Sequence, residues 1–137
     1  MTVLLVDAAN VVGSRPDGWW RDREGATARL LVRLAFLAGR TLLGPDDAAL
    51  ECTGVIAVVE GRARRVTAPE ALRLVRAEGS GDDALVALVG ERVGTAVLVV
   101  TADRGLRARL PSGTPVAGPG WLLRVLDDLD ADGTPSA

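Results

Sequence analysis

Three short, uninterrupted apolar runs set the architecture that this sequence can adopt. They lie at residues 3–6, 55–59 and 97–100 and consist of aliphatic, largely β-branched side chains. None of them alternates apolar with polar residues, as a strand with one solvated face would. Each run therefore predicts a strand that is buried on both faces of a sheet, which is typical of parallel sheets covered by helices.

Segments with helical spacing of apolar residues separate these strands. The predicted helices cover residues 23–38, 71–77, 82–93, 104–110 and 121–129. Pro69 stands where the second of them would begin. Residues 62–67 fit either a strand extension or a loop, and residues 115–117 fit a last short strand. The alternation predicts a three-layer α/β/α sandwich with a mostly parallel central sheet.

The chain should form one domain. Its 137 residues, 48% hydrophobic and 25% charged, suffice for one hydrophobic core and are too apolar for a disordered chain. We expect the domain to span residues 1–129 and residues 130–137 to form a frayed acidic tail. No internal repeat or interdomain linker interrupts this pattern.

Several features point to a cytoplasmic protein. No signal peptide precedes the first strand, and no apolar run approaches the roughly 20 residues that a membrane helix needs. Cys52 is the single cysteine, so an intrachain disulfide is excluded and a thiolate zinc site lacks ligands. The net charge of −2 argues against a strongly basic nucleic-acid binder, but four aspartates gather after residue 126. The net charge of the chain therefore does not show whether its partner is a nucleic acid.

Carboxylates follow the ends of all three predicted strands. Asp7 comes directly after the first strand, Glu60 after the second and Asp103 just after the third, while Asp82 and Asp83 begin the helix that leads into the third. Because the carboxyl ends of parallel strands meet at one edge of a sheet, these side chains should converge there.

Each acid also has a purely structural explanation. Asp82 could cap its helix with Asp83 in the first turn, and Asp103 could cap the helix that begins at Arg104. Glu60 could be a solvated turn residue. Asp7 is harder to explain in this way, because it ends a buried strand and no counter-charge follows it in the sequence.

Clustered carboxylates repel one another and raise each other's pKa unless a cation neutralises them. The chain contains no histidine, so the donors are all oxygen, which favours Mg²⁺ or Mn²⁺ over zinc. A metal site of this kind activates water and stabilises charge on a phosphate group.

Three ordered motifs resemble those of NYN domains in the PIN-like ribonuclease superfamily, and most closely the bacterial YacP-like NYN proteins. They are the strand ending in Asp7-Ala-Ala-Asn10, the segment Gly79-Ser-Gly-Asp82-Asp83, and Thr101-Ala-Asp103. The resemblance implies a PIN-like fold and metal-dependent cleavage of RNA. It implies metal ligation by Asp7, by Asp82 or Asp83, and by Asp103.

The same resemblance implies roles for the neighbouring polar residues. Asn10 would hold Asp7 or a metal-bound water, and Thr101 would support Asp103. Glu60 stands where relatives often have an aspartate, so it is assigned a supporting role. Ala8 replaces the usual glycine, which matters little if its φ is negative.

Candidate RNA-binding residues lie near the same predicted edge. We expect phosphate contacts from Arg62, Arg64, Arg65 and Arg104, and stacking of unpaired bases on Trp19 and Trp20. Residues 62–65 could equally be a solvated basic face, and the tryptophan pair could instead pack its loop. Trp121 is assigned to packing. Single-stranded RNA is the expected substrate.

The sequence can also be compared with what other classes of protein require. A haloacid-dehalogenase-type phosphatase needs a second aspartate where Ala9 stands, and residues 10–14 contain no phosphate-binding glycine loop. The stronger alternative is a non-catalytic PIN-like domain that binds RNA or a protein, including a component of a toxin–antitoxin pair. The sequence leaves a homodimer and a protein partner open.

Overall fold

The structure is a computed structural model that describes residues 1–131 except 17 and 93. Of Arg62 and Ala131 it describes the backbone alone. Within this part, the chain forms one sheet of six strands. The strands are β1 (Thr2–Asp7), β2 (Arg40–Leu43), β3 (Ala49–Val59), β4 (Arg73–Arg76), β5 (Val97–Val100) and β6 (Val116–Ala117).

The central strand of the sheet is β1. It pairs in parallel with β3 on one side and with β5 on the other, and β6 continues the sheet in parallel beyond β5. Along the outer side of β3, β4 runs parallel to the second half and β2 antiparallel to the first half. The carboxyl ends of β1, β3, β4 and β5 therefore meet at one edge.

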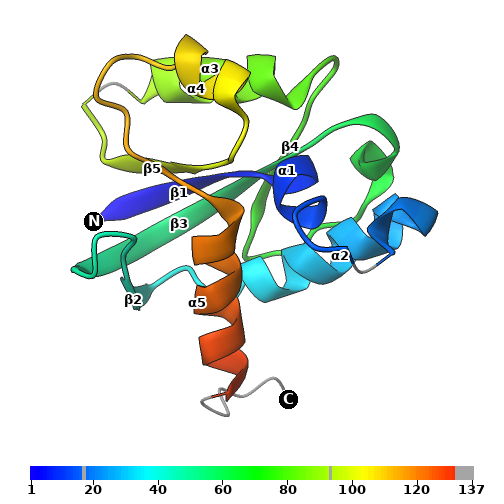
Figure 1. Cartoon of the computed structure of the whole chain (residues 1–137), viewed down its shortest axis with the longest axis horizontal. Helices are drawn as coiled ribbons and strands as arrows, with labels where there is room; N and C mark the ends of the chain where they lie inside the picture. The colour runs from blue at the N-terminus through cyan, green and yellow to red at the C-terminus, as the bar shows by residue number, and fades with distance from the viewer. Residues whose placement is uncertain (17, 93, 132–137) are drawn as a thin grey trace.

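Helices cover both faces of this sheet (Figure 1). They are α1 (Ala8–Val12), α2 (Arg23–Leu34), α3 (Gly81–Glu91), α4 (Arg104–Arg109) and α5 (Pro119–Ala131), with 3-10 helices η1 (Trp19–Arg21) and η2 (Gly61–Arg65). Figure 1 shows α3 and α4 above the sheet and α1, α2 and α5 on the other side. The predicted three-layer α/β/α sandwich with a mostly parallel sheet is confirmed.

The two hydrophobic cores are built from alternate residues of the same strands. In β1, Leu4 and Val6 pack with residues of α1, α2 and α5, whereas Leu5 packs with residues of α3 and α4. Because successive side chains of a strand point to opposite faces, a sheet with helices on both sides needs apolar residues at every position. This requirement explains the uninterrupted apolar runs.

The segment 71–77 was predicted wrongly as a helix, because it contains the strand β4. Leu74 packs into the core below the sheet and Val75 into the core above it, which is the alternation of a strand. Backbone pairing with β3 outweighs the helix-start signal of Pro69. Residues 61–65 form the 3-10 helix η2 rather than a strand extension.

Other boundaries also differ from the prediction. Helix α2 ends at Leu34 rather than at residue 38, and a series of turns leads to Gly39, whose φ of 84° favours glycine. The short antiparallel strand β2 was not predicted, and β3 begins six residues earlier than expected, at Ala49. Helix α5 extends through Ala131 and includes Asp130; residues 132–137 of the predicted tail lie outside the description.

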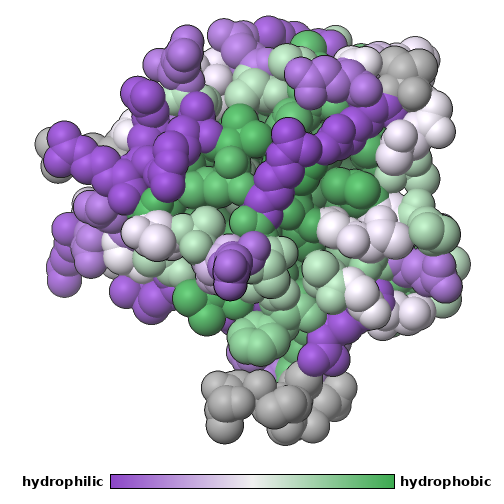
Figure 2. All heavy atoms as spheres, turned by 180° about the vertical axis from the view of Figure 1, so that it is seen from behind, coloured by the Kyte–Doolittle hydropathy of each residue, from purple (hydrophilic) through white to green (hydrophobic). Residues whose placement is uncertain are grey.

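Trp121 packs at the start of α5, as predicted. It is 7% exposed, and its indole Nε1 donates a hydrogen bond of 2.9 Å to the carbonyl oxygen of Leu43. No helix in the described part of the chain is long and apolar enough to cross a membrane. The space-filling view from behind shows hydrophobic residues among hydrophilic ones, so this face has mixed character (Figure 2).

Candidate functional site

Asp7 lies at the carboxyl end of β1 and is 5% exposed. Its Oδ1 accepts a hydrogen bond of 3.4 Å from the backbone N–H of Asn10, which caps the first turn of α1. Its Oδ2 accepts a hydrogen bond of 3.0 Å from the hydroxyl of Thr101, the residue that follows β5. The carboxylate is therefore buried and held from both neighbouring segments.

Two further hydrogen bonds order this region, one between the segments that follow β1 and β5 and one within the segment that follows β5. The side-chain Oδ1 of Asn10 accepts one of 2.7 Å from the backbone N–H of Ala102. The hydroxyl oxygen of Thr101 accepts one of 3.1 Å from the N–H of Asp103. Asp103 in turn caps α4, because its Oδ1 accepts a hydrogen bond of 3.1 Å from the N–H of Leu106. These contacts fix the relative positions of Asp7 and Asp103.

Glu60 connects the end of β3 to the start of α3. Its carboxylate accepts a hydrogen bond from the backbone N–H of Gly81, the first residue of α3. The N-cap of this helix is Ser80, whose hydroxyl accepts a hydrogen bond of 3.3 Å from the N–H of Asp83. Glu60 therefore positions the helix start that carries Asp82. The alternative that Glu60 is only a turn residue facing solvent is therefore wrong.

The electrostatics show that four carboxylates share this edge. The pKa of Asp7 is raised from 3.8 to about 6. Burial is the largest cause, the hydrogen bonds from Thr101 and Asn10 act against it, and the charges of Glu60 and Asp82 add to it. The pKa of Asp82 is also raised, by burial first and then by the charges of Asp103 and Glu60. Asp7, Glu60, Asp82 and Asp103 are thus electrostatically coupled, and we call them the carboxylate cluster.

The carboxylate cluster is not a closed metal shell. Among the residues that the structure describes, no group of three or more Asp, Glu, His or Cys side chains is placed to hold a metal ion. The donors are nevertheless all oxygen, and Mg²⁺ commonly binds through one or two carboxylates while it keeps several waters. The chemistry of the donors therefore fits a divalent cation that is largely hydrated.

The two aspartates of α3 take different positions. Asp83 is exposed and forms an ion pair of 2.7 Å with the guanidinium of Arg109 on α4. Asp82 is half-buried and is the one coupled to Glu60 and Asp103. Where the sequence left the choice between Asp82 and Asp83 open, the structure brings Asp82 into the carboxylate cluster and directs Asp83 to Arg109.

The predicted phosphate-binding arginines flank the carboxylate cluster on two sides. Arg64 and Arg65 are exposed on η2, which directly follows Glu60. The guanidinium of Arg76 donates to the backbone carbonyl of Arg64 and so ties η2 to β4. Arg104 is exposed in the first turn of α4, next to Asp103. The side chain of Arg62 lies outside the description.

The tryptophan pair lies on η1, and its two members differ in exposure. Trp19 is half-buried, with the guanidinium carbon of Arg23 5.2 Å from its ring centroid. Trp20 packs edge-on against Trp19 with centroids 6.1 Å apart and is 54% exposed. Trp19 thus packs the loop, while Trp20 retains a surface on which a base can stack.

Sequence reasoning missed two arginines next to the carboxylate cluster. Arg15 and Arg124 line a hollow of about 530 Å³ that also borders Asn10 and Ala102. Arg15 follows α1 and Arg124 lies on α5, so only the tertiary structure brings them together. A larger hollow of about 590 Å³ borders Thr2 and the beginning of β5, at the opposite edge of the sheet from the carboxylates.

Comparisons with known proteins identify the fold. No protein-family model matches this sequence, and no curated protein matches it. Among solved structures, the chain is similar to the crystal structure of Rae1 (YacP) from Bacillus subtilis, in its W164L mutant form. The TM-score is 0.67 at 20% sequence identity, and the match covers 96% of this chain and 79% of that chain. The chain therefore has the fold of YacP, and its resemblance to the YacP-like proteins is confirmed at the level of the fold.

Proposed function

We propose that this protein is a divalent-metal-dependent ribonuclease that hydrolyses phosphodiester bonds in single-stranded RNA. The observation that carries the proposal is the buried Asp7, coupled to Glu60 and Asp82 at the carboxyl edge of the sheet. Ionising a carboxylate that is buried near other acids is unfavourable, and a bound cation offsets this cost directly. The fold shared with YacP and the three NYN-like motifs support the same function.

Asp7, Asp82 and Asp103 are the carboxylates that would hold the cation, one or two of them directly and the rest through its waters. The oxygen-only chemistry of the donors favours Mg²⁺ or Mn²⁺. When bound, such a cation activates a water for attack and neutralises charge on the phosphate. This chemistry needs no serine, cysteine or histidine as nucleophile or base. A chain without histidine can therefore carry it out.

The chain's own polar residues would hold these ligands in place. The Thr101 hydroxyl donates to Asp7 and accepts from the N–H of Asp103, so a single side chain orients two ligands. Asn10 fixes the backbone that leads into Asp103 through its bond to Ala102. Pre-organised ligands matter because small displacements at a catalytic centre have large effects on rate.

Arginines on both sides of the carboxylate cluster would position the RNA. Arg64 and Arg65 extend from η2 and Arg104 from α4, and Arg62 belongs to the same proposed set. The exposed face of Trp20 suits stacking of an unpaired base, which favours single-stranded over duplex RNA.

The test is cleavage of single-stranded and structured RNAs with Mg²⁺ or Mn²⁺, measured for wild type, Asp7→Asn and Asp103→Asn. Loss of a metal ligand should abolish turnover, while Arg64→Ala should mainly weaken binding. Asp83→Asn is a matched comparison, because that aspartate is paired with Arg109 and, of the acids whose charge raises the pKa of Asp82, has the smallest effect. Full activity of Asp7→Asn would refute the proposal.

The alternative is a non-catalytic domain that binds RNA. The absence of a ready three-carboxylate metal group from the described residues favours it. If wild type binds RNA, leaves it intact with every divalent metal, and Asp103→Asn binds equally well, this alternative replaces the nuclease proposal. The same measurements therefore separate the two functions.

A further inference from the structure

A groove leads away from the carboxylate cluster along the face formed by α1, α2 and α5. It begins at the hollow of about 530 Å³ that borders Asn10, Arg15 and Arg124. It continues into a second hollow of about 230 Å³ that borders Arg15, Arg29 and Arg33. Arg15 and Leu123 line both hollows, so the two hollows are neighbours on this face. We call this surface the arginine groove.

The near end of the arginine groove adjoins the carboxylate cluster. Asn10 lines the groove and donates its backbone N–H to the carboxylate of Asp7, and its side chain binds the N–H of Ala102 in the same wall. Small residues make up much of this end of the groove; they are Ala9, Gly13, Ala102 and Gly120. Short side chains leave room for a polymer backbone to approach the protein closely.

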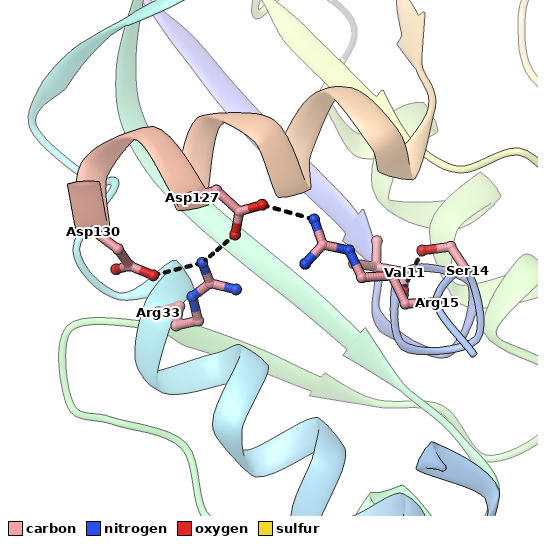
Figure 3. A network of polar contacts seen from close by, with 6 residues as sticks. All are labelled: Val11, Ser14, Arg15, Arg33, Asp127 and Asp130. Atoms are coloured by element: carbon pink, nitrogen blue, oxygen red, sulfur yellow. Dashed lines mark hydrogen bonds and ion pairs between the residues drawn. The ribbon is translucent and has the colours of Figure 1, made fainter. Parts of the chain in front are cut away.

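Two of the four arginines are already paired (Figure 3). Asp127 on α5 accepts from Arg15 at 2.8 Å and from Arg33 at 2.9 Å, and Asp130 accepts from Arg33 at 2.7 Å. Hydrogen bonds from Arg15 and Arg33 lower the pKa of Asp127. Asp127 therefore remains charged and fixes both guanidinium groups along the groove.

The other two arginines have no ion-pair partner among the described residues. Arg29 on α2 and Arg124 on α5 are exposed, and neither forms an ion pair with any residue that the structure describes. Their positive charge, together with the donors of Arg15 and Arg33 that Asp127 does not occupy, gives the groove a net affinity for anions. Its shape, elongated from Asn10 to Arg33, suits a linear polyanion.

We propose that the arginine groove binds the sugar–phosphate backbone of the RNA strand on one side of the scissile phosphate, with Arg124 as its principal phosphate contact. This inference rests on the proposed function, since it places the strand that the carboxylate cluster would cut. Asp127 limits the strength of the groove by neutralising Arg15 and Arg33. The groove and the arginines of η2 and α4 would then hold the strand on opposite sides of the carboxylate cluster.

The test measures binding of a fluorescent single-stranded RNA in EDTA, so that binding is separate from cleavage, between about 50 and about 300 mM salt. Arg124→Gln should weaken binding roughly five- to tenfold at the low-salt end and reduce the slope of log K against log salt by about 1. Asp127→Asn should tighten binding, because it releases Arg15 and leaves Arg33 paired with Asp130 alone. If Asp127 contributed to stability alone, Asp127→Asn would not bind RNA more tightly than wild type.

Two control variants make the same changes in charge, loss of one acid or of one arginine, at positions outside the arginine groove. Glu91→Gln neutralises an exposed acid at the end of α3, on the other side of the sheet, and Arg40→Gln removes an arginine at the opposite edge of the sheet, level with Cys52. Both should bind RNA within about twofold of wild type, apart from the small effect of net charge. Thermal melts of all four variants confirm that they are folded.

The outcomes separate the groove from the nuclease proposal. If Arg124→Gln and Arg40→Gln lose affinity equally, or if Asp127→Asn binds no better than Glu91→Gln, the groove is not the binding surface. If wild type cleaves RNA while Arg124→Gln has an unchanged KM, the groove proposal fails and the nuclease proposal stands. If binding depends on Arg124 but no metal supports cleavage, the groove stands and the nuclease proposal fails.

Discussion

Asp7→Asn should stabilise the metal-free protein at neutral pH, although it removes a residue from the centre of the carboxylate cluster. Burial, its largest cause, raises the pKa of Asp7 from 3.8 to about 6. The folded state therefore holds the proton more tightly than the unfolded state does. The resulting stability is fully present below about pH 3.8 and is lost as the pH rises through about 6.

The size of the effect follows from the two pKa values. The difference between 3.8 and about 6 corresponds to ~3 kcal/mol of unfavourable free energy in the wild type once Asp7 is ionised. Asparagine avoids this cost because it carries no charge. It can replace only one of the two acceptor oxygens that face Thr101 and Asn10, which should offset about 1 kcal/mol of the gain. We therefore expect Asp7→Asn to be about 2 kcal/mol more stable than wild type near pH 7.5.

The assay is urea or thermal unfolding in EDTA, from about pH 4 to about pH 8. A gain of about 2 kcal/mol should raise Tm by roughly 4 to 10 °C near pH 7.5, and the gain should shrink toward pH 4, where Asp7 is protonated in the folded wild type. Asp128→Asn, on the exposed side of α5, is the matched control and should change Tm little at any pH. If Asp7→Asn were less stable than wild type by an amount independent of pH, the argument from burial would be wrong.

The remaining predictions concern the same site. Mn²⁺ at about a hundredfold excess over its Kd should stabilise wild type by ~2.7 kcal/mol in thermal melts, and Asp7→Asn should show a smaller response; equal responses would remove Asp7 from the metal site. Thr101→Val removes a hydrogen bond that lowers the pKa of Asp7, so a carbon-13 NMR titration in EDTA should place that pKa above about 6, and an unchanged value would contradict the role of the hydroxyl. Arg109→Gln breaks only an exposed ion pair with Asp83, so its unfolding free energy should change by no more than about 1 kcal/mol; a larger loss would mean that this pair helps to hold α3 in place.

The architecture could be predicted because the strands at the centre of the sheet are constrained on both faces. Leu4, Leu5 and Val6 are all fully buried, so no polar residue is tolerated among them. The strands at the edge of the sheet carry a weaker signal. In β4, Arg73 and Arg76 are exposed and only Leu74 and Val75 reach the cores, so the short segment resembled a helix.

The carboxylate cluster was predictable in position but not in detail. The rule that parallel strands end at one edge placed Asp7 and Asp103 together, and the Thr101 hydroxyl proved to join them. Sequence could not distinguish Asp82 from Asp83, because their roles depend on where Arg109 lies, on a different helix. The resemblance assigned Thr101 to Asp103, whereas its hydroxyl also donates to Asp7.

The arginine groove was invisible to sequence reasoning for a different reason. Arg15 and Arg124 are separated by most of the chain and belong to no motif, and in the last predicted helix only Trp121 was assigned a role, in packing. The packing is what brings them together: Leu122 and Leu126 bury one face of α5 in the core below the sheet, while Arg124 and Asp127 stay at the surface. A helix that buries one face must expose another, and here the exposed residues adjoin Arg15, which follows the α1 helix capped by Asp7. The burial that completes the core thus also places the proposed phosphate-binding surface beside the carboxylates, so that stability and substrate positioning would depend on different faces of one helix.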